Sequence, residues 1–324
     1  MIQEVAAAIK KHKRFLISAH VNPEGDSLCS QLAVKELLAS LGKEAVIVNN
    51  DQPPDHYRFL PGIEAVSTDL KRRVDFDAAL ILDCPTLKRI GGVARMIGKG
   101  RDIINIDHHI SSERFGTVNW VDANASSTGE MVYKLFKEMD IALTKEVALL
   151  LYIAILTDTG SFNYDNTSAV THEIASDLLG YGLEPGTVSE SVYERRTLTD
   201  IKLLGLVLST LKVNSTGEIA YLEITGKMLA DTGADVAKSE GFINYARSID
   251  GIKVAILFKE DPQSAGKINV SFRSKAGADV NKIASFFGGG GHIKASGCVL
   301  EGSIGDVEAR VIARVEEELK EDQV

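Results

Sequence analysis

The first half of the chain alternates short, continuously apolar runs with segments whose apolar residues recur at helical spacing. The runs are residues 15–19, 45–48, 78–82 and 103–106. Helical patterns span 27–41 and, after the last run, 128–139, 145–156 and 168–181. Strands buried on both faces are apolar throughout, and their alternation with helices is typical of a parallel sheet covered on both sides. The sequence therefore predicts an α/β fold with an N-terminal parallel-sheet domain.

A second, smaller unit is expected after about residue 211, because 324 residues suffice for roughly two domains. Its expected strands are 218–224, 252–259, 267–275 and 297–300, and its expected helices lie near 239–249, 279–287 and 306–320. We predict a first domain at 1–187, a linker helix at 188–211 and a second α/β domain with a mixed sheet at 212–324. Ligands of such folds bind beyond the carboxyl ends of strands and often between domains, so the active site is expected in the interdomain cleft.

Charge and cysteine content limit the partners. The 36 basic and 45 acidic residues give a net charge of -9, which argues against a long nucleic-acid duplex because such binding needs a broad basic surface. Cys29, Cys84 and Cys298 form no C-x-x-C pair, so neither a disulfide framework nor a thiolate zinc site is supported. The longest apolar run, 147–156, is shorter than the roughly 20 residues of a membrane helix. Residues 1–8 lack a signal-peptide pattern, and we expect a cytoplasmic protein with no membrane partner.

Acidic and histidine residues follow four apolar segments, 15–19, 78–82, 103–106 and 152–157. Any one of them alone would usually be a cap or turn residue. Because parallel strands end at the same edge of a sheet, the four segments together predict that these side chains converge there. They are His20, Glu24, Asp26, Asp83, Asp107, His108, His109 and Asp158.

So many carboxylates at one place would repel one another strongly unless divalent cations compensated their charge. Carboxylate and imidazole ligands without a thiolate suit Mn²⁺ or Mg²⁺, and imidazole favours Mn²⁺. A central carboxylate can bridge two metals about 3.5–4 Å apart, the spacing found in two-metal hydrolases. Phosphoester hydrolysis is therefore the leading predicted chemistry.

These segments resemble the four motifs of the DHH phosphoesterase family: His20-Val-Asn-Pro-Glu24-Gly-Asp26, Asp83 after its strand, Asp107-His108-His109, and Asp158. Residues 272–275 (Phe-Arg-Ser-Lys) and 288–292 (Gly-Gly-Gly-Gly-His) resemble its DHH-associated domain, so the resemblance spans nearly the whole chain. The layout is most similar to the NrnA-type oligoribonuclease and pAp-phosphatase branch. This resemblance implies hydrolysis of short RNAs and dinucleotides such as pApA, and of pAp to AMP and phosphate. It also implies two divalent ions, with Mn²⁺ preferred and Mg²⁺ or Co²⁺ as alternatives.

The resemblance also implies a role for each motif residue. Asp107 would orient the neighbouring imidazole, and His109 would face the substrate phosphate. The family usually has Asp where this sequence has Glu24, whose carboxylate reaches one methylene further. The implied ligands are His20 and Glu24 for one metal, Asp26, His108 and Asp158 for the other, and Asp83 as the bridge.

The glycine run at 288–291 is a candidate for binding a phosphate or nucleobase, because glycine lets backbone N–H groups approach an anion closely. Taken alone, such a run is more typical of a flexible turn. The sequence contains no G-x-x-x-x-G-K-[ST] and no G-x-G-x-x-G after its first strand, so neither a Walker-type site nor a dinucleotide fold is supported. The candidate substrate-binding residues are Arg195, Arg273, Ser274, Gly289, Gly290, Gly291 and His292.

Other functions stay open at this point. A family II-type pyrophosphatase and a RecJ-like single-strand exonuclease share the N-terminal motifs. The glycine–histidine motif is unusual for the former, and the latter usually carries extra domains. A catalytically weak nucleotide sensor is supported only by Glu24. Exposed strand edges or the linker helix are compatible with a homodimer.

Overall fold

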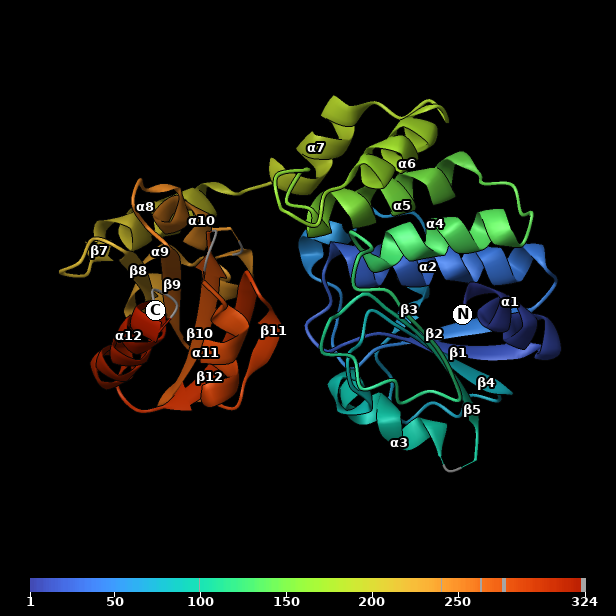
Figure 1. Cartoon of the computed structure of the whole chain (residues 1–324), viewed down its shortest axis with the longest axis horizontal. Coiled ribbons are helices and arrows are strands. Elements are labelled where there is room, and N and C mark those ends of the chain that lie inside the picture. The colour runs from blue at the N-terminus through green and yellow to red at the C-terminus, as the bar shows by residue number, and fades with distance from the viewer. Residues whose placement is uncertain (99, 240, 263, 276–277, 322–324) are drawn as a thin grey trace. The chain divides into compact units, whose positions relative to one another are not determined.

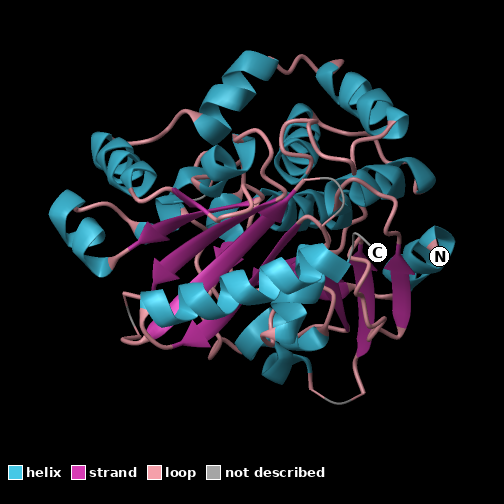
Figure 2. Ribbon diagram, turned by 60° about the vertical axis from the view of Figure 1, so that its left-hand side comes forward, coloured by secondary structure: helices cyan, strands magenta, loops and turns pink. Residues whose placement is uncertain are grey.

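The computed structural model of the chain describes residues 1–98, 100–239, 241–262, 264–275 and 278–321. It divides the chain into two compact units, Met1–Arg195 and Arg196–Val324 (Figure 1). Both units contain strands and helices (Figure 2).

The first unit contains the predicted parallel sheet, with six strands in the order β3-β2-β1-β4-β5-β6. Every neighbouring pair is parallel. All five residues of β4 are buried, as its apolar sequence predicts. Two strands were not predicted: β3, which has only two residues, and β6, which has four. The strands are β1 Arg14–Ser18, β2 Glu44–Val48, β3 Val66–Ser67, β4 Ala78–Leu82, β5 Asp102–Asp107 and β6 Val118–Val121.

Helices cover both faces of this sheet. In Figure 1, α2, α4 and α5 lie on one side of the strands and α3 on the other. The helical segments of the unit are α1 Ile2–Lys11, α2 Gly25–Ser40, η1 Asp55–Tyr57, η2 Ile63–Ala65, η3 Leu87–Val93, α3 Ala94–Ile97, α4 Thr128–Glu138, α5 Lys145–Asp158, α6 Ala169–Leu179 and α7 Pro185–Tyr193.

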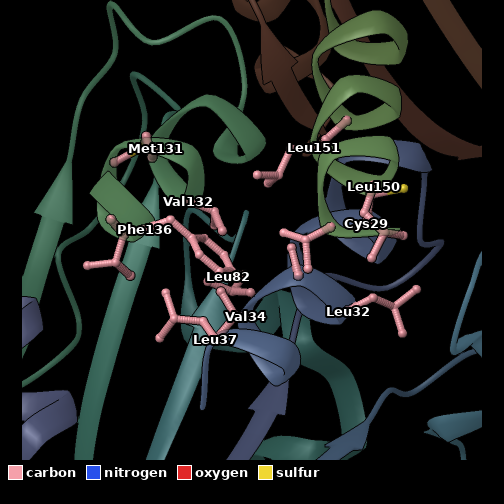
Figure 3. Close-up of a cluster of buried hydrophobic side chains, with 14 of the residues drawn as sticks. Cys29, Leu32, Val34, Leu37, Leu82, Met131, Val132, Phe136, Leu150 and Leu151 are labelled. Carbon is pink, nitrogen blue, oxygen red and sulfur yellow. The ribbon is translucent and has the colours of Figure 1, made fainter. Parts of the chain in front are cut away.

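The larger core of the first unit lies between the sheet and helices α2, α4 and α5. Its side chains come from segments far apart in the sequence, and Figure 3 shows part of this cluster. Helix α5 is apolar nearly all round because it is buried nearly all round. The residues labelled in Figure 3 are Cys29, Leu32, Val34, Leu37, Leu82, Met131, Val132, Phe136, Leu150 and Leu151.

The second unit has a mixed six-stranded sheet in the order β11-β12-β10-β9-β8-β7, in which only β8 and β9 pair in parallel. One apolar cluster includes Phe258 and Phe272, and a second includes Ala255 and Leu257, so alternate residues of the sheet enter different cores. The elements are α8 Leu198–Ser209, β7 Lys212–Val213, β8 Ile219–Ile224, α9 Gly226–Thr232, η4 Val236–Ser239, α10 Ile243–Ser248, β9 Val254–Glu260, β10 Lys267–Ser274, α11 Val280–Phe286, β11 Gly290–His292, β12 Ala295–Glu301 and α12 Ile304–Glu321.

The segment 188–211, expected as one linker helix, holds the end of α7 and all of α8. A new helix begins at Thr197, whose Oγ1 accepts a hydrogen bond from the Asp200 N–H at 3.2 Å. The Asp200 carboxylate in turn accepts from the Thr197 N–H at 2.8 Å, which completes a capping box. Helix α8 buries Leu203 and Val207 in a core of the second unit. Among the described residues, no helix has both the length and the apolar character needed to cross a membrane.

Asp77 fastens the start of β1 to the chain just before β4. Its Oδ2 accepts from the Arg14 N–H at 3.0 Å and the Lys13 N–H at 3.2 Å, and its Oδ1 accepts from Arg14 Nη2 at 2.8 Å. Hydrogen bonds from the Arg14 side chain and backbone lower the pKa of Asp77 from its ordinary 3.8 to about 2. A carboxyl whose pKa is lower in the folded state stabilises the fold above its unfolded pKa, and this stabilisation disappears as pH falls through about 2.

We therefore expect Asp77→Asn to lower the melting temperature at neutral pH, and we expect the difference from the wild type to shrink in acid. The effect is modest because the pair is partly exposed to solvent. Melting curves at pH values from neutral down to the lowest at which the wild type stays folded measure it. A difference that stays constant over this range would show that the Asp77 charge does not contribute.

Candidate active site

Asp83 lies at the centre of a buried cluster of imidazoles and carboxylates. It directly follows β4 with a φ of 52°, a left-handed conformation that is uncommon for residues other than glycine. Its Oδ2 is 3.3 Å from His20 Nε2, and its Oδ1 is 3.5 Å from His108 Nε2 and 3.6 Å from His109 Nδ1. Asp83 Oδ1 also accepts a hydrogen bond from Thr128 Oγ1 at 3.3 Å. The edge of the sheet therefore brings one carboxylate against three imidazoles, as predicted for the ends of β1, β4 and β5.

Asp26 lies in the first turn of α2 and binds the N-terminus of α4. Its Oδ2 accepts from the Thr128 N–H at 2.7 Å, and its Oδ1 accepts from the Gly129 N–H at 2.8 Å and from Ser30 Oγ at 3.0 Å. A carboxylate is favourable there because the start of a helix carries partial positive charge. The approach requires glycine at 129, because an added Cβ would lie 2.3 Å from Ala154 Cβ and 3.3 Å from Asp26 Oδ1.

His108 faces the carboxylates from β5. Its Nδ1 is 3.3 Å from the Ala125 carbonyl oxygen, so Nδ1 carries the hydrogen in the neutral ring and the Nε2 lone pair points toward the acids. Nε2 lies 3.5 Å from Asp158 Oδ2 and 3.9 Å from Asp26 Oδ2. His108 therefore contacts three carboxylates that come from three different elements.

The helix expected at 145–156 is present as α5, so Asp158 does not follow a strand as the other candidate ligands do. Asp158 is the last residue of helix α5 and reaches the cluster from the layer of helices above the sheet. A short apolar run at 152–157 does not distinguish a buried strand from a buried helix, and here the helix is buried nearly all round.

His20 and Glu24, at opposite ends of one motif, have different environments. His20 Nδ1 is 2.7 Å from the Val21 carbonyl oxygen, which turns Nε2 toward Asp83. Glu24 is the exposed N-cap of α2, and its backbone N–H donates to Ser27 Oγ at 3.0 Å. Its side chain is exposed, yet its negative charge still raises the pKa of His20. The structure thus places His20 against the Asp83 carboxylate and leaves the Glu24 side chain at the surface.

Asp107 and His109 form a hydrogen-bonded pair beside Asp83. Asp107 is fully buried, and its Oδ1 is 2.7 Å from His109 Nδ1. Because a carboxylate oxygen accepts hydrogen bonds, Nδ1 carries the hydrogen, and Nε2 is the ring atom that can accept or transfer a further proton.

Burial and mutual repulsion dominate the electrostatics of the cluster. Burial, together with the charges of Asp83 and Asp158, raises the pKa of Asp26 well above its ordinary value. Burial also raises the pKa of Asp158 to about 6, against an opposing effect of His108. For His20, burial lowers the pKa, but Asp83 and Glu24 outweigh burial and raise it to about 9. Without a cation, the cluster therefore favours bound protons to offset its carboxylate charge.

The donor set fits divalent cations. Ligand atoms of Asp26, Asp83 and His108 lie within 4.8 Å of one another, and so do those of Asp83, Asp107 and His109. Carboxylate oxygens and imidazole nitrogens are the ligands of Mn²⁺ and Mg²⁺. A cation between Asp26, Asp83 and Asp158 would replace the protons that their repulsion otherwise requires.

Among the substrate candidates of the second unit, Arg273 and Ser274 end strand β10. Arg273 is partly exposed, and its Nη1 donates to the Phe272 carbonyl oxygen at 3.0 Å. Ser274 is 2% exposed, and its Oγ donates to the Ala278 carbonyl oxygen at 2.8 Å. The serine hydroxyl therefore links the end of β10 to Ala278, whereas the arginine side chain is partly exposed.

The glycine run enters a short hairpin of β11 with β12. An added Cβ would lie 2.1 Å from the Gly297 carbonyl oxygen at Gly289 and 2.5 Å from the Ala295 carbonyl oxygen at Gly291. Close backbone packing thus explains these two glycines. At Gly290, the nearest atom would be 3.8 Å away, so packing does not require glycine there. His292 pairs with Ala295 next to the turn, and β11 is the edge strand of its sheet.

Arg195 ends the first unit. Its guanidinium lies 5.3 Å from the ring centroid of Phe59, and the side chain is exposed. Phe59 itself packs against the larger core of that unit. The contact with Phe59 restrains the exposed Arg195 side chain. The sequence alone did not indicate this contact.

Three residues that organise the cluster were missed from the sequence: Thr128, Gly129 and Asn166. The first two stand where α4 begins, after the N-cap Ser127, whose side chain accepts from the Glu130 N–H. That S-x-x-E pattern is a recognisable helix start. Its contact with Asp26, however, joins residues about 100 positions apart, which no local pattern reveals.

The chain matches two known domain families. The DHH family N-terminal domain matches residues 14–155, and the DHHA1 domain matches residues 217–321. The first range includes the candidate ligands from His20 to His109. The second includes the glycine–histidine hairpin.

Relatives cover the chain over its full length. It is 32% identical to the bifunctional oligoribonuclease and PAP phosphatase NrnA of Thermus thermophilus, over 98% of this chain and 94% of that protein. It is 28% identical to NrnA of Bacillus subtilis, over 99% of each. An exopolyphosphatase-related protein from Bacteroides fragilis has the same fold, with a TM-score of 0.90 at 27% identity, over 100% of this chain and 97% of that one.

Proposed function

This chain belongs to the DHH family, and we propose that it is a divalent-cation-dependent phosphoesterase acting on short nucleotides. Its proposed substrates are oligoribonucleotides of a few residues, dinucleotides such as pApA, and pAp, which yields AMP and phosphate. The observation that carries the proposal is the buried Asp83 carboxylate, which lies within 3.6 Å of three imidazoles. Similarity to proteins named for oligoribonuclease and PAP phosphatase activity supports the substrate class.

The ligands are proposed on the geometry of the cluster. Asp83 would lie between two cations, with Mn²⁺ as the preferred ion. When bound, such cations activate a water molecule and neutralise charge on the phosphoryl oxygens. The proposed ligands are His20 on one side, and Asp26, His108 and Asp158 on the other. Glu24, whose side chain is exposed, is proposed beside His20 because of its place in the DHH motif.

His109 is proposed to act on the substrate phosphate. Asp107 fixes the ring through Nδ1 at 2.7 Å and compensates the charge of a protonated imidazole. Nε2 would then hold a proton for the leaving oxygen, which is the role of a general acid. Asp107 thus orients the ring and stabilises its charged form.

The second unit is proposed to bind the nucleotide through Arg273, His292 and the glycine hairpin. Arg195, the last residue of the first unit, is proposed as a further positively charged side chain for the nucleotide. Gly289, Gly290 and Gly291 expose backbone along an edge strand, and Gly290 is a glycine that packing does not require. Close approach of a ligand would account for it. Ser274 would support this surface through its hydrogen bond to Ala278.

A substrate panel tests the proposed function. We expect the purified protein with Mn²⁺ to release AMP from pApA and phosphate from pAp, and to cleave RNAs of two to five nucleotides faster than long single strands. Products separated by anion-exchange chromatography measure this. Faster turnover of pyrophosphate would favour a pyrophosphatase, and faster turnover of long strands would favour a RecJ-like exonuclease. If the protein releases no product from pApA and none from pAp, the proposal is overturned.

A further inference from the structure

Asn166, in the loop between α5 and α6, joins the ends of two helices through its side-chain amide. Its Nδ2 is 2.8 Å from the Ser126 carbonyl oxygen, 3.1 Å from the Asp158 carbonyl oxygen and 3.5 Å from Asp158 Oδ2. All three neighbours can only accept hydrogen bonds. The amide orientation is therefore fixed, with its two N–H groups facing them.

These contacts connect two carboxylates of the cluster. Asp158 is the last residue of α5, and Ser126 precedes the N-cap of α4. The first N–H groups of α4, at Thr128 and Gly129, donate to Asp26. A hydrogen-bonded path thus runs from Asp26, through the start of α4, to Asn166 and Asp158.

The loop after Asp158 is built so that the chain turns back on the end of α5. Gly160, Ser161 and Phe162 have consecutive φ values of 55°, 61° and 63°. A bulky residue in the left-handed region is strained and persists only where its surroundings hold it. Thr159 Oγ1 accepts from the Phe162 N–H at 3.0 Å, and the Ser161 N–H donates to the Leu156 carbonyl oxygen at 2.8 Å.

We propose that Asn166 is a positioning residue that fixes the Asp158 carboxylate opposite His108 and Asp26 for cation binding. The inference rests on the proposed function, in which Asp158 is a ligand. Asp158 needs such support because it comes from a helix end, whereas Asp83 is held by the sheet. Groups that orient a metal ligand typically contribute about 10- to 100-fold in affinity.

Mn²⁺ affinity, measured by electron paramagnetic resonance of the free ion, tests this. We expect Asn166→Ala and Asn166→Asp both to bind Mn²⁺ about 10- to 100-fold more weakly than the wild type. Asn166→Asp keeps the shape but removes the donors and adds a negative charge. The added negative charge alone would tighten cation binding. Weaker binding by this variant would therefore show that the Asp158 carboxylate is no longer held in place.

Asn163→Ala is the matched control. Asn163 is exposed in the same loop, and its Nδ2 donates to the carbonyl oxygens of Gly160 at 2.8 Å and Ser161 at 3.2 Å. This variant should bind Mn²⁺ as the wild type does, even if it melts at a lower temperature.

Three results would overturn the inference. The first is Mn²⁺ affinity of a folded Asn166→Ala protein equal to that of the wild type. The second, which decides the matter if Asn166→Ala does not fold, is tighter binding by Asn166→Asp. The third is a wild-type protein that binds no Mn²⁺, which overturns the proposed function as well, whereas the first two leave that function standing.

Discussion

Asp83→Asn is expected to abolish turnover of pApA and to reduce the number of bound Mn²⁺ ions. The Asp83 carboxylate contacts three imidazoles and is the proposed bridge, and an amide would offer only one neutral oxygen to the cations. Cation binding stabilises a phosphoryl-transfer transition state by several kcal/mol, so the loss should be about 1,000-fold or more. Steady-state rates and metal content on the same preparation measure both effects.

Asparagine is the suitable replacement because Asp83 has a φ of 52°, a conformation that asparagine tolerates better than alanine does. Asp140→Asn is the matched control, since Asp140 is exposed and has a φ of 54°. This control should keep full activity and metal content. Turnover retained by the Asp83→Asn protein would show that Asp83 does not bridge two cations.

Asp107→Asn is expected to reduce kcat by about 10²- to 10⁴-fold, the usual contribution of a positioned acid or base. The amide keeps the size of the side chain but not the charge that stabilises protonated His109. If its nitrogen faces Nδ1, it also reverses the tautomer of the ring. Bound Mn²⁺ should be unchanged, because Asp107 is proposed to orient His109 and not to hold a cation.

The contrast with Asp83→Asn separates loss of metal from loss of proton transfer. Asp102→Asn, at the other end of β5, is the control for a changed charge on the same strand. Asp102 contacts Lys11 and His12, so its variant should affect stability and leave kcat intact. Should Asp107→Asn lose Mn²⁺ together with activity, Asp107 would be a ligand and the proposed division of roles would fail.

The strands that carry the site could be predicted because each is a continuous apolar run. β1, β4 and β5 lie where the sequence placed them, and His20, Asp83 and His108 meet at their ends. β3 and β11 have only two and three residues, too few for any apolar pattern to identify them.

The helical side of the site was harder to predict. The helix ending at Asp158 was expected from its pattern, but its place above the strand ends was not. Asp26 binds the start of α4 about 100 residues away, and Asn166 joins that start to Asp158. Such contacts depend on how the helices pack, and the periodicity of a single segment does not predict this packing.

Release of AMP from pApA, before and after Mn²⁺ is added to metal-stripped protein, tests the central claim most directly. We expect the metal-stripped protein to release no AMP and to regain full turnover once Mn²⁺ is added. Asp83→Asn should release no AMP in either condition. Release that persists without a divalent cation, or none at any Mn²⁺ concentration, would contradict it.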